Sequence, residues 1–355
     1  MKKICPLFLS TLLSPAIAPA ANTSADDATV PVGTMEVVAE MELSPGNVAT
    51  SEEGRVFATI HPLRESSLQL VEIMDDSSLV PFPNLEMQLV AGDTAISEKF
   101  DDPLGLVFDN QNRLWFVDVG LSLGHPRVFA YDIDTGEELY RFDVPIEFIT
   151  DSSFVQDLAI DEDRGFIYLA DAADPAIIVI DVKKGSYRRI VHDASMASED
   201  VDIVIDGQVQ KWMGSPARIG INPITLSANR STLFYGAMNG ENWYQLPTDK
   251  IRSGESDENI IESISLAGPK PVSDGVATDE KGYHYFTNLA GSIDVLTPQQ
   301  ELYVLKEHEF IDWPDSVRIS GDWLYVASNQ IHKSPAFAEQ EYSKPPYRVL
   351  RIKYR

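Results

Sequence analysis

The chain has 355 residues, of which 44% are hydrophobic, so it can bury a large core and is not disordered as a whole. With 28 Lys+Arg against 55 Asp+Glu, it carries a formal net charge of −27 at pH 7. Such a charge disfavours nucleic acids and anionic membranes as partners. The negative charge favours cationic ligands or divalent metal ions instead. The alternative interpretation is that it only keeps the protein soluble.

Residues 1–20 have the features of a cleaved export signal. Two lysines precede a short apolar stretch, and Ala18-Pro19-Ala20 fits the small-x-small cleavage pattern, which places the cut after Ala20. The stretch is too short for a membrane span, and no later segment is apolar over 18 residues. Cleavage removes Cys5, the single cysteine, so the mature chain has no disulfide. We therefore expect a secreted or periplasmic protein in which residues 21–36 form a flexible leader.

A unit of two strand-like runs joined by a polar turn recurs along the rest of the chain. The second run of each copy contains an aromatic residue, and these aromatics lie 40 to 66 residues apart. The copies are Asn47–Thr59, Leu104–Asp118, Gln156–Asp171, Asn222–Gly236, Asp274–Asn288 and Asp315–Asn329.

Six copies at this spacing predict an all-β protein, a single six-bladed β-propeller over residues 37–355. The alternative is a two-sheet sandwich, against which the long repeat period counts. Strand-like sequences at Met35–Met41 and Tyr347–Arg355 are candidates for completing a terminal blade and closing the ring.

The predicted hairpins bring polar residues to one mouth of the central channel. The first strand of each blade lines the channel, and the second runs back antiparallel, so the start of one lies beside the end of the other. Carboxylates and amides gather at these positions, where they could bind a cation or only cap strand ends. The expected ring is Asp102, Asp118, Gln156, Asp157, Asp171, Asn222, Asp274, Asn288, Asp315 and Asn329.

Other residue patterns add one candidate and exclude two classes of enzyme. Trp313 directly precedes the last channel-lining strand and could stack on a ring or an ammonium group, with core packing as the alternative. The histidines form no H-E-x-x-H pair, and no G-x-S-x-G motif is present. Zincin-type and α/β-hydrolase-type sites are therefore unsupported.

Several motifs together resemble the yellow / major royal jelly protein family. They include GRVFATIHP (54–62), LWFVDVG (114–120), SDGVATDEKGYHYFTN (273–288) and WPDSVRISGDWLYVASNQIHK (313–333). The resemblance implies a secreted six-bladed propeller with a small-molecule site at the channel mouth. Some members of that family convert dopachrome and some salivary members bind biogenic amines. Insect members usually carry disulfides, so the cysteine-free mature chain and its signal indicate a bacterial relative.

A more distant resemblance is to the six-bladed gluconolactonases of the senescence-marker family. It implies a divalent cation, such as Ca²⁺, held in part by Asn222 and Asp274, with Asp274 as a candidate base. The early glutamate of that family is missing, because residues 44–48 read SPGNV. A third ligand is thus not identified.

Three functions follow from these observations. The first is a propeller that binds a cationic or catechol-type small molecule at the channel mouth, with Asp274 and Asp315 as anchors. The second is an enzyme in the same site, either a metal-assisted lactone hydrolase or a dopachrome-type isomerase. The third is a platform for a protein partner.

Overall fold

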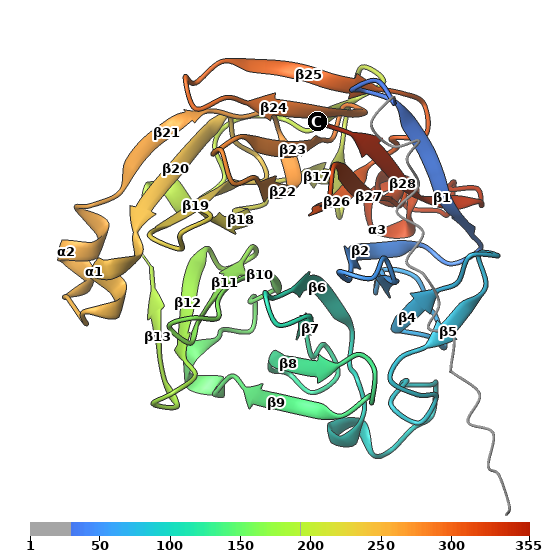
Figure 1. Ribbon diagram of the computed structural model, residues 1–355, viewed down its shortest axis with the longest axis horizontal. Helices are drawn as coiled ribbons and strands as arrows, with labels where there is room; N and C mark the ends of the chain where they lie inside the picture. The colour runs from blue at the N-terminus through green and yellow to red at the C-terminus, as the bar shows by residue number, and fades with distance from the viewer. Residues whose placement is uncertain (1–29, 192) are drawn as a thin grey trace, which may run out of the picture. The chain divides into compact units, whose positions relative to one another are not determined.

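The repeats fold into antiparallel sheets arranged around one axis (Figure 1). The computed structural model describes residues 30–191 and 193–355, and these residues form six four-stranded sheets, as expected for a six-bladed propeller. Val32–Arg355 is one compact unit, to which the following description refers. The expected signal peptide and most of the leader lie outside the described residues.

The first three blades follow one another along the chain, each with its innermost strand first. Blade 1 consists of β2 (Pro45–Thr50), β3 (Val56–Ile60), β4 (Leu70–Ile73) and β5 (Leu79–Pro81). Blade 2 consists of β6 (Pro103–Phe108), β7 (Arg113–Asp118), β8 (Arg127–Asp132) and β9 (Glu138–Asp143). Blade 3 consists of β10 (Val155–Asp161), β11 (Phe166–Asp171), β12 (Ala176–Asp181) and β13 (Ser186–Ile190).

The next two blades repeat the arrangement. Blade 4 consists of β18 (Ile221–Leu226), β19 (Thr232–Ala237), β20 (Asn242–Pro247) and β21 (Ser265–Pro269). Blade 5 consists of β22 (Ser273–Thr278), β23 (His284–Asn288), β24 (Ser292–Leu296) and β25 (Leu302–Glu307).

Blade 6 combines strands from distant parts of the chain. From the channel outwards it contains β26 (Pro314–Ser320), β27 (Trp323–Ser328), β28 (Tyr347–Lys353) and β1 (Met35–Met41). The antiparallel pairing of β1 with β28 closes the ring, so both candidate strands complete the terminal blade. β1 begins at Met35, two residues before the expected start of the propeller at residue 37.

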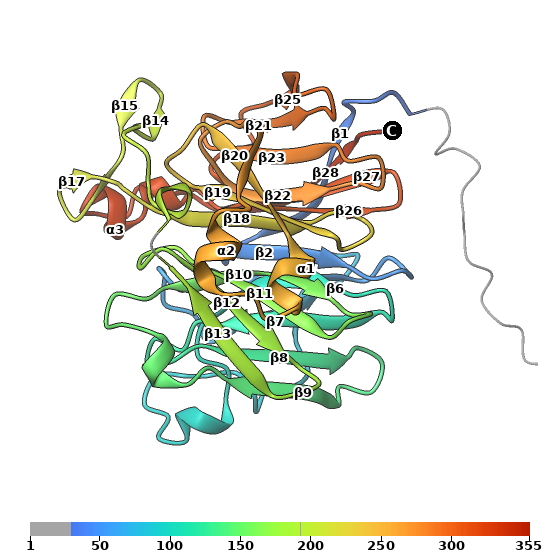
Figure 2. The ribbon, with the colours of Figure 1, turned by 90° about the vertical axis from the view of Figure 1, so that its left-hand side faces the viewer.

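Connections between the blades carry the remaining elements. Short helices are η2 (Ile96–Glu98), η3 (Ile146–Phe148), η4 (Ala194–Met196), α1 (Thr248–Arg252), α2 (Asp257–Ile261), η5 (Ile331–Lys333) and α3 (Pro335–Ala338). Two small hairpins between blades 3 and 4 are formed by β14 (Val204–Ile205), β15 (Gln208–Val209), β16 (Lys211–Trp212) and β17 (Ser215–Pro216). These hairpins and α3 project from the same side of the ring (Figure 2). No helix in the described part of the chain is long and apolar enough to span a membrane.

The hydrophobic core lies between neighbouring blades. For example, Trp115 and Val117 on blade 2 pack with Ile167 and Ile178 on blade 3. The faces of a single sheet cannot be buried without these neighbours, which is why the repeats are stable only as a ring. Repeated aromatics of the second strands serve this packing, as Tyr168 does between blades 3 and 4.

Each innermost strand has a β-bulge at its start. In blade 5 Ser273 pairs with Asn288 and Val276 with Phe286, so β22 has one extra residue. Register shifts occur at the corresponding place in the other five blades. A bulge redirects the side chain of the extra residue. The partner of Asn288 is therefore Ser273 and not Asp274, in contrast to the regular pairing that the sequence indicated.

The side chain of Arg318, on β26, crosses the central channel. Its Nε donates to the carbonyl oxygen of Leu106 on β6 (2.9 Å), and Nη1 donates to that of Val276 on β22 (3.4 Å). Its Nη2 forms an ion pair with Asp157 on β10 (2.9 Å). Arg318 thus joins blades 2, 3, 5 and 6 and separates the two mouths of the channel.

Candidate functional site

A cavity of about 440 Å³ lies at the mouth where the innermost strands begin. Its polar side chains include three residues that follow the first residue of an innermost strand, Gln156, Asp274 and Asp315. The rest of the lining is largely apolar, and it includes Leu63, Leu121, Phe154, Ile219, Met238 and Ile331. The cavity is thus a hydrophobic pocket with a few polar groups, as small-molecule sites commonly are. One of these is Arg218, whose guanidinium is paired with Asp200 and Asp202.

Aromatic side chains from two segments outside the blades, the β16–β17 hairpin and helix α3, line the same cavity. Trp212 on β16 meets Phe337 on α3 with ring centroids 5.2 Å apart. Phe337 in turn meets Trp313, with centroids 5.0 Å apart. The backbone of Trp313 is left-handed, with φ of 50°, which is a strained conformation for a large side chain. The contacts on the indole hold it beside Asp274.

Asp274 is buried, and neutral donors occupy both of its oxygen atoms. The amide Nδ2 of Asn222 donates to Oδ1, and the indole Nε1 of Trp313 donates to Oδ2 at 2.8 Å. Burial raises the pKa of Asp274 to about 7, although these two hydrogen bonds lower it. The carboxyl group therefore changes charge near neutral pH.

Asp315, on the neighbouring blade, is also buried. Its Oδ2 accepts a hydrogen bond from Nδ2 of Asn329 (2.6 Å) and lies 3.6 Å from Nε2 of His61. The pKa of His61 is lowered to about 3 by burial and by the nearby Arg64, so the imidazole is neutral and forms no true ion pair with Asp315. Its Nδ1 accepts from the backbone N–H of Leu63 (3.2 Å), which leaves the proton on Nε2, facing Asp315.

The two carboxyl groups influence each other. Burial, and secondly the charge of Asp274, raise the pKa of Asp315 well above its ordinary value. The inner strands that carry them are very close, since a Cβ on Gly275 would lie 2.6 Å from the carbonyl oxygen of Asp315. The pair therefore retains a proton near neutral pH, and a bound cation could take the place of that proton.

The structure brings some of the expected ring together at the cavity but not all of it. Gln156, Asp274, Asp315 and Trp313 line the cavity, while Asn222 and Asn329 hydrogen-bond to its two aspartates. Asp157 lies in the channel and is paired with Arg318.

The residues that end the second strands do not reach the cavity. Asp118 pairs with the buried Arg127, and Asp171 pairs with Arg189 at 2.8 Å. Asn288 donates to Asp294 at 2.8 Å. These side chains join neighbouring strands and loops, which is the capping role that the sequence left open. Asp102, before blade 2, is also absent from the cavity lining.

Sequence reasoning missed the residues that come one position later. His61, Ala172 and Met238 directly follow the second strand of blades 1, 3 and 4, and all three line the cavity. Asn329, which the sequence did identify, occupies the equivalent place in blade 6. Counting one position beyond each second strand, as the bulge requires, would have found His61.

The arrangement of Asn222 and Asp274 does not fit a divalent cation. The amide nitrogen of Asn222, not its oxygen, faces Asp274, and Trp313 occupies the second carboxylate oxygen. Residues 30–191 and 193–355 contain no group of three or more His, Cys, Asp or Glu side chains that could hold a metal ion. We therefore derive no chemical step through a metal at this site.

The fold and this cavity define a six-bladed β-propeller with a ligand-sized pocket at one channel mouth. The chain belongs to the major royal jelly protein family, whose model matches residues 103–351. A relative is the yellow-related salivary protein SP04 of Phlebotomus argentipes, which is 26% identical over 279 residues and 69% of each chain.

Solved structures share the fold at low sequence identity. A gluconolactonase from Xanthomonas campestris is 10% identical with a TM-score of 0.55, over 90% of this chain and 89% of that one. Virginiamycin B lyase from Staphylococcus aureus is 12% identical with a TM-score of 0.53, over 90% and 98%. Both likenesses concern the fold alone.

Proposed function

We propose that the cavity binds a small aromatic amine of the catechol type. The observation that carries this proposal is the pair of buried aspartates, Asp274 and Asp315, whose hydrogen-bonding partners are neutral groups. A buried carboxylate without a cation is costly, so an ammonium group that enters the cavity gains a strong interaction. Trp313 and Phe337 offer aromatic faces for the ring of such a ligand.

The family resemblance supports the same ligand class, because some salivary members of the family bind biogenic amines. The relative with 26% identity is itself a salivary protein. We also infer that this chain acts after export, as residues 1–20 predict from sequence.

Asp274→Asn is expected to weaken the binding of dopamine about tenfold to a hundredfold, because the variant loses a charge-assisted hydrogen bond in a buried site. Isothermal titration calorimetry at pH 7.5 measures the effect. Catechol, which lacks the ammonium group, should bind weakly to both proteins.

The matched control is Asp294→Asn. Asp294 is also a buried carboxylate that accepts two side-chain hydrogen bonds, from Asn288 and Ser292, but it lies on β24 away from the cavity. This control should leave the affinity unchanged. Equal affinities for dopamine in wild type and Asp274→Asn would refute the proposed role of Asp274.

The affinity for the amine is expected to depend on pH. Burial raises the pKa of Asp274 to about 7, and the ammonium group prefers the ionised carboxylate. Below pH 7 the ligand must displace a proton from Asp274. When one proton is involved, the dissociation constant should therefore rise about tenfold for each unit by which the pH falls. Titrations between pH 5 and 8.5 test this, and the Asp274→Asn variant should show a flatter profile.

A second candidate function is proton-transfer catalysis in the same cavity. A carboxylate with a pKa near 7 is well matched to a general base at neutral pH. Conversion of a dopachrome-like compound should then increase as the pH rises through about 7, and Asp274→Asn should abolish it. Absence of turnover by wild type would leave binding as the function of the pocket.

A further inference from the structure

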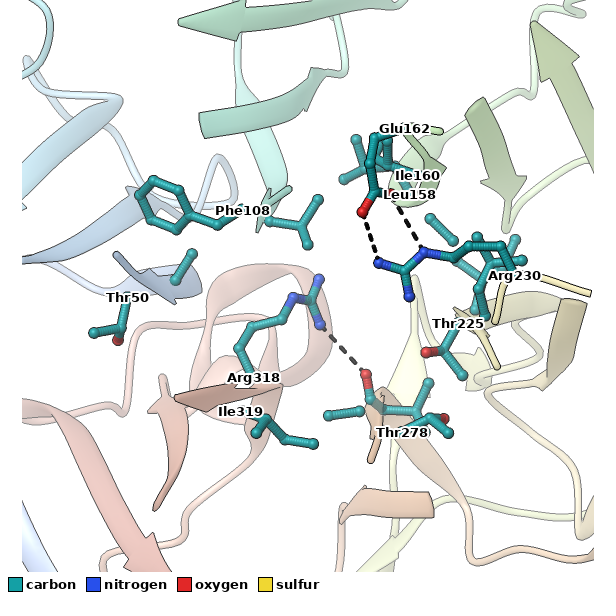
Figure 3. Close-up of a pocket in the computed structure, with 17 residues that line it drawn as sticks. Thr50, Phe108, Leu158, Ile160, Glu162, Thr225, Arg230, Thr278, Arg318 and Ile319 are labelled. Atoms are coloured by element: carbon teal, nitrogen blue, oxygen red, sulfur yellow. Dashed lines mark hydrogen bonds and ion pairs between the residues drawn. The ribbon is translucent and has the colours of Figure 1, made fainter. Parts of the chain in front are cut away.

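A second cavity, of about 260 Å³, lies at the opposite mouth of the channel (Figure 3). Its lining includes Thr50, Phe108 and Thr278, which are the last residues of the innermost strands β2, β6 and β22. The first cavity, in contrast, lies where these strands begin. The side chain of Arg318 separates the two spaces, so the second cavity is a distinct site and does not depend on the proposed amine function.

Two guanidinium groups point into this cavity (Figure 3). Arg230 pairs with Glu162 through Nε at 3.3 Å and through Nη2 at 3.0 Å. Among the described residues its Nη1 has no hydrogen-bond partner, which leaves two N–H groups available. Arg318 makes four hydrogen bonds through its five N–H groups, so one N–H of Nη2 is also available.

The carboxylate in the lining does not offset these donors. Both oxygen atoms of Glu162 are already used by Arg230. Guanidinium N–H groups that lack a protein acceptor favour a ligand that supplies acceptor oxygens.

The remaining lining determines what else the ligand must carry. Phe108, Ile160 and Ile319 present apolar side chains to the same space. The volume of about 260 Å³ is below the usual range for drug-sized ligands. These features favour a short apolar chain and disfavour a bare, strongly hydrated ion such as phosphate.

We propose that the second cavity binds a small organic carboxylate. The carboxylate oxygens accept from Arg230 Nη1 and from the available N–H of Arg318, and the apolar part contacts Phe108 and Ile319. Arginine is the side chain best suited to such planar recognition of a carboxylate. Although the chain as a whole is acidic, the one carboxylate of this lining, Glu162, is already paired with Arg230.

The test is a titration of the full chain with butyrate, by calorimetry and by ligand-observed NMR, in a chloride buffer at constant ionic strength. We expect a dissociation constant of about 1 mM or below. Butylammonium, which has the same chain and the opposite charge, should not compete with butyrate. No detectable binding of butyrate at about 10 mM, or binding of phosphate but not butyrate, overturns the proposal.

Two variants assign the site without breaking the fold. Arg230→Lys can retain the ion pair with Glu162 but loses the planar fork, and Ile319→Ala shortens a partly buried apolar side chain of the lining. Arg230→Lys should weaken butyrate binding about tenfold and Ile319→Ala should also weaken it, while thermal midpoints stay close to that of wild type. Arg188→Lys, on the outer strand β13, is the matched control and should bind butyrate as wild type does. Unchanged affinity in both Arg230→Lys and Ile319→Ala would show that butyrate binds elsewhere.

Discussion

Arg318→Met is expected to lower the free energy of unfolding by about 3–5 kcal/mol, since removing one partner of a buried ion pair leaves the other charge uncompensated. Asp157 would remain in the channel without its cation. The carbonyl oxygens of Leu106 and Val276 would lose a donor at the same time. Thermal unfolding should show a midpoint about 10 °C lower than that of wild type.

The loss should also depend on pH. Burial already raises the folded-state pKa of Asp157, although Arg318 lowers it, and without Arg318 this pKa rises further. The unfolded chain releases that proton near pH 4, so the folded variant loses stability as the pH rises above that value. Urea denaturation should therefore show a smaller deficit at pH 5 than at pH 8.

Two further variants separate the ion pair from general effects of substitution. Arg188→Met removes an arginine whose ion pair with Asp257 is partly exposed, and it should cost less than about 1 kcal/mol. Arg318→Met combined with Asp157→Leu replaces the whole pair by apolar groups and should recover much of the loss. If Arg318→Met is as stable as Arg188→Met, then the contacts of Arg318 across the channel do not stabilise the propeller.

Removal of β1 is the second change with a large expected effect. A chain that begins at Glu42 lacks the outermost strand of blade 6 and exposes the edge of β28. It also loses the buried side chains of Ala39 and Met41 and the ion pair of Glu40 with Arg348. We expect a loss on the order of 5 kcal/mol, with aggregation through the open edge.

A chain that begins at Val32 is the control for this deletion. It keeps all of β1 and the hydrogen bond from Gly33 to the carbonyl oxygen of Lys353 (2.7 Å). Thermal unfolding and size-exclusion chromatography should show that it matches the full chain, while the chain from Glu42 melts more than about 10 °C lower or aggregates. Equal behaviour of the two chains would mean that β1 does not hold the ring closed.

The fold was predictable because its signal is local and repeated. Each strand–turn–strand unit carries its own apolar alternation and its own aromatic residue, such as Trp115 or Tyr168, and six such units can bury their faces only against each other. The strand-like sequences at Met35–Met41 and Tyr347–Arg355 were both candidates for closing the ring, and the structure shows that they pair with each other.

The approximate position of the site was also predictable, since the start of an innermost strand faces the channel mouth. Asp274, Asp315 and Gln156 were identified in this way and line the cavity. Asp118 and Asn288, at the ends of second strands, were expected there as well. Their side chains instead bond to Arg127 and Asp294 on the adjacent strands. The bulge moves the residue that faces the channel mouth by one position. The alternation of apolar and polar residues along a strand does not reveal such a shift.

The sequence by itself thus determined the six-bladed architecture and the strand ends from which a site could be built. Only the tertiary structure decided which side chains meet across the channel. His61 contacts Asp315, and Arg318 reaches Asp157 from 161 positions away. Such contacts depend on how six bulged strands converge on one axis. That geometry arises when the ring closes and the blades pack, not from any local pattern of residues.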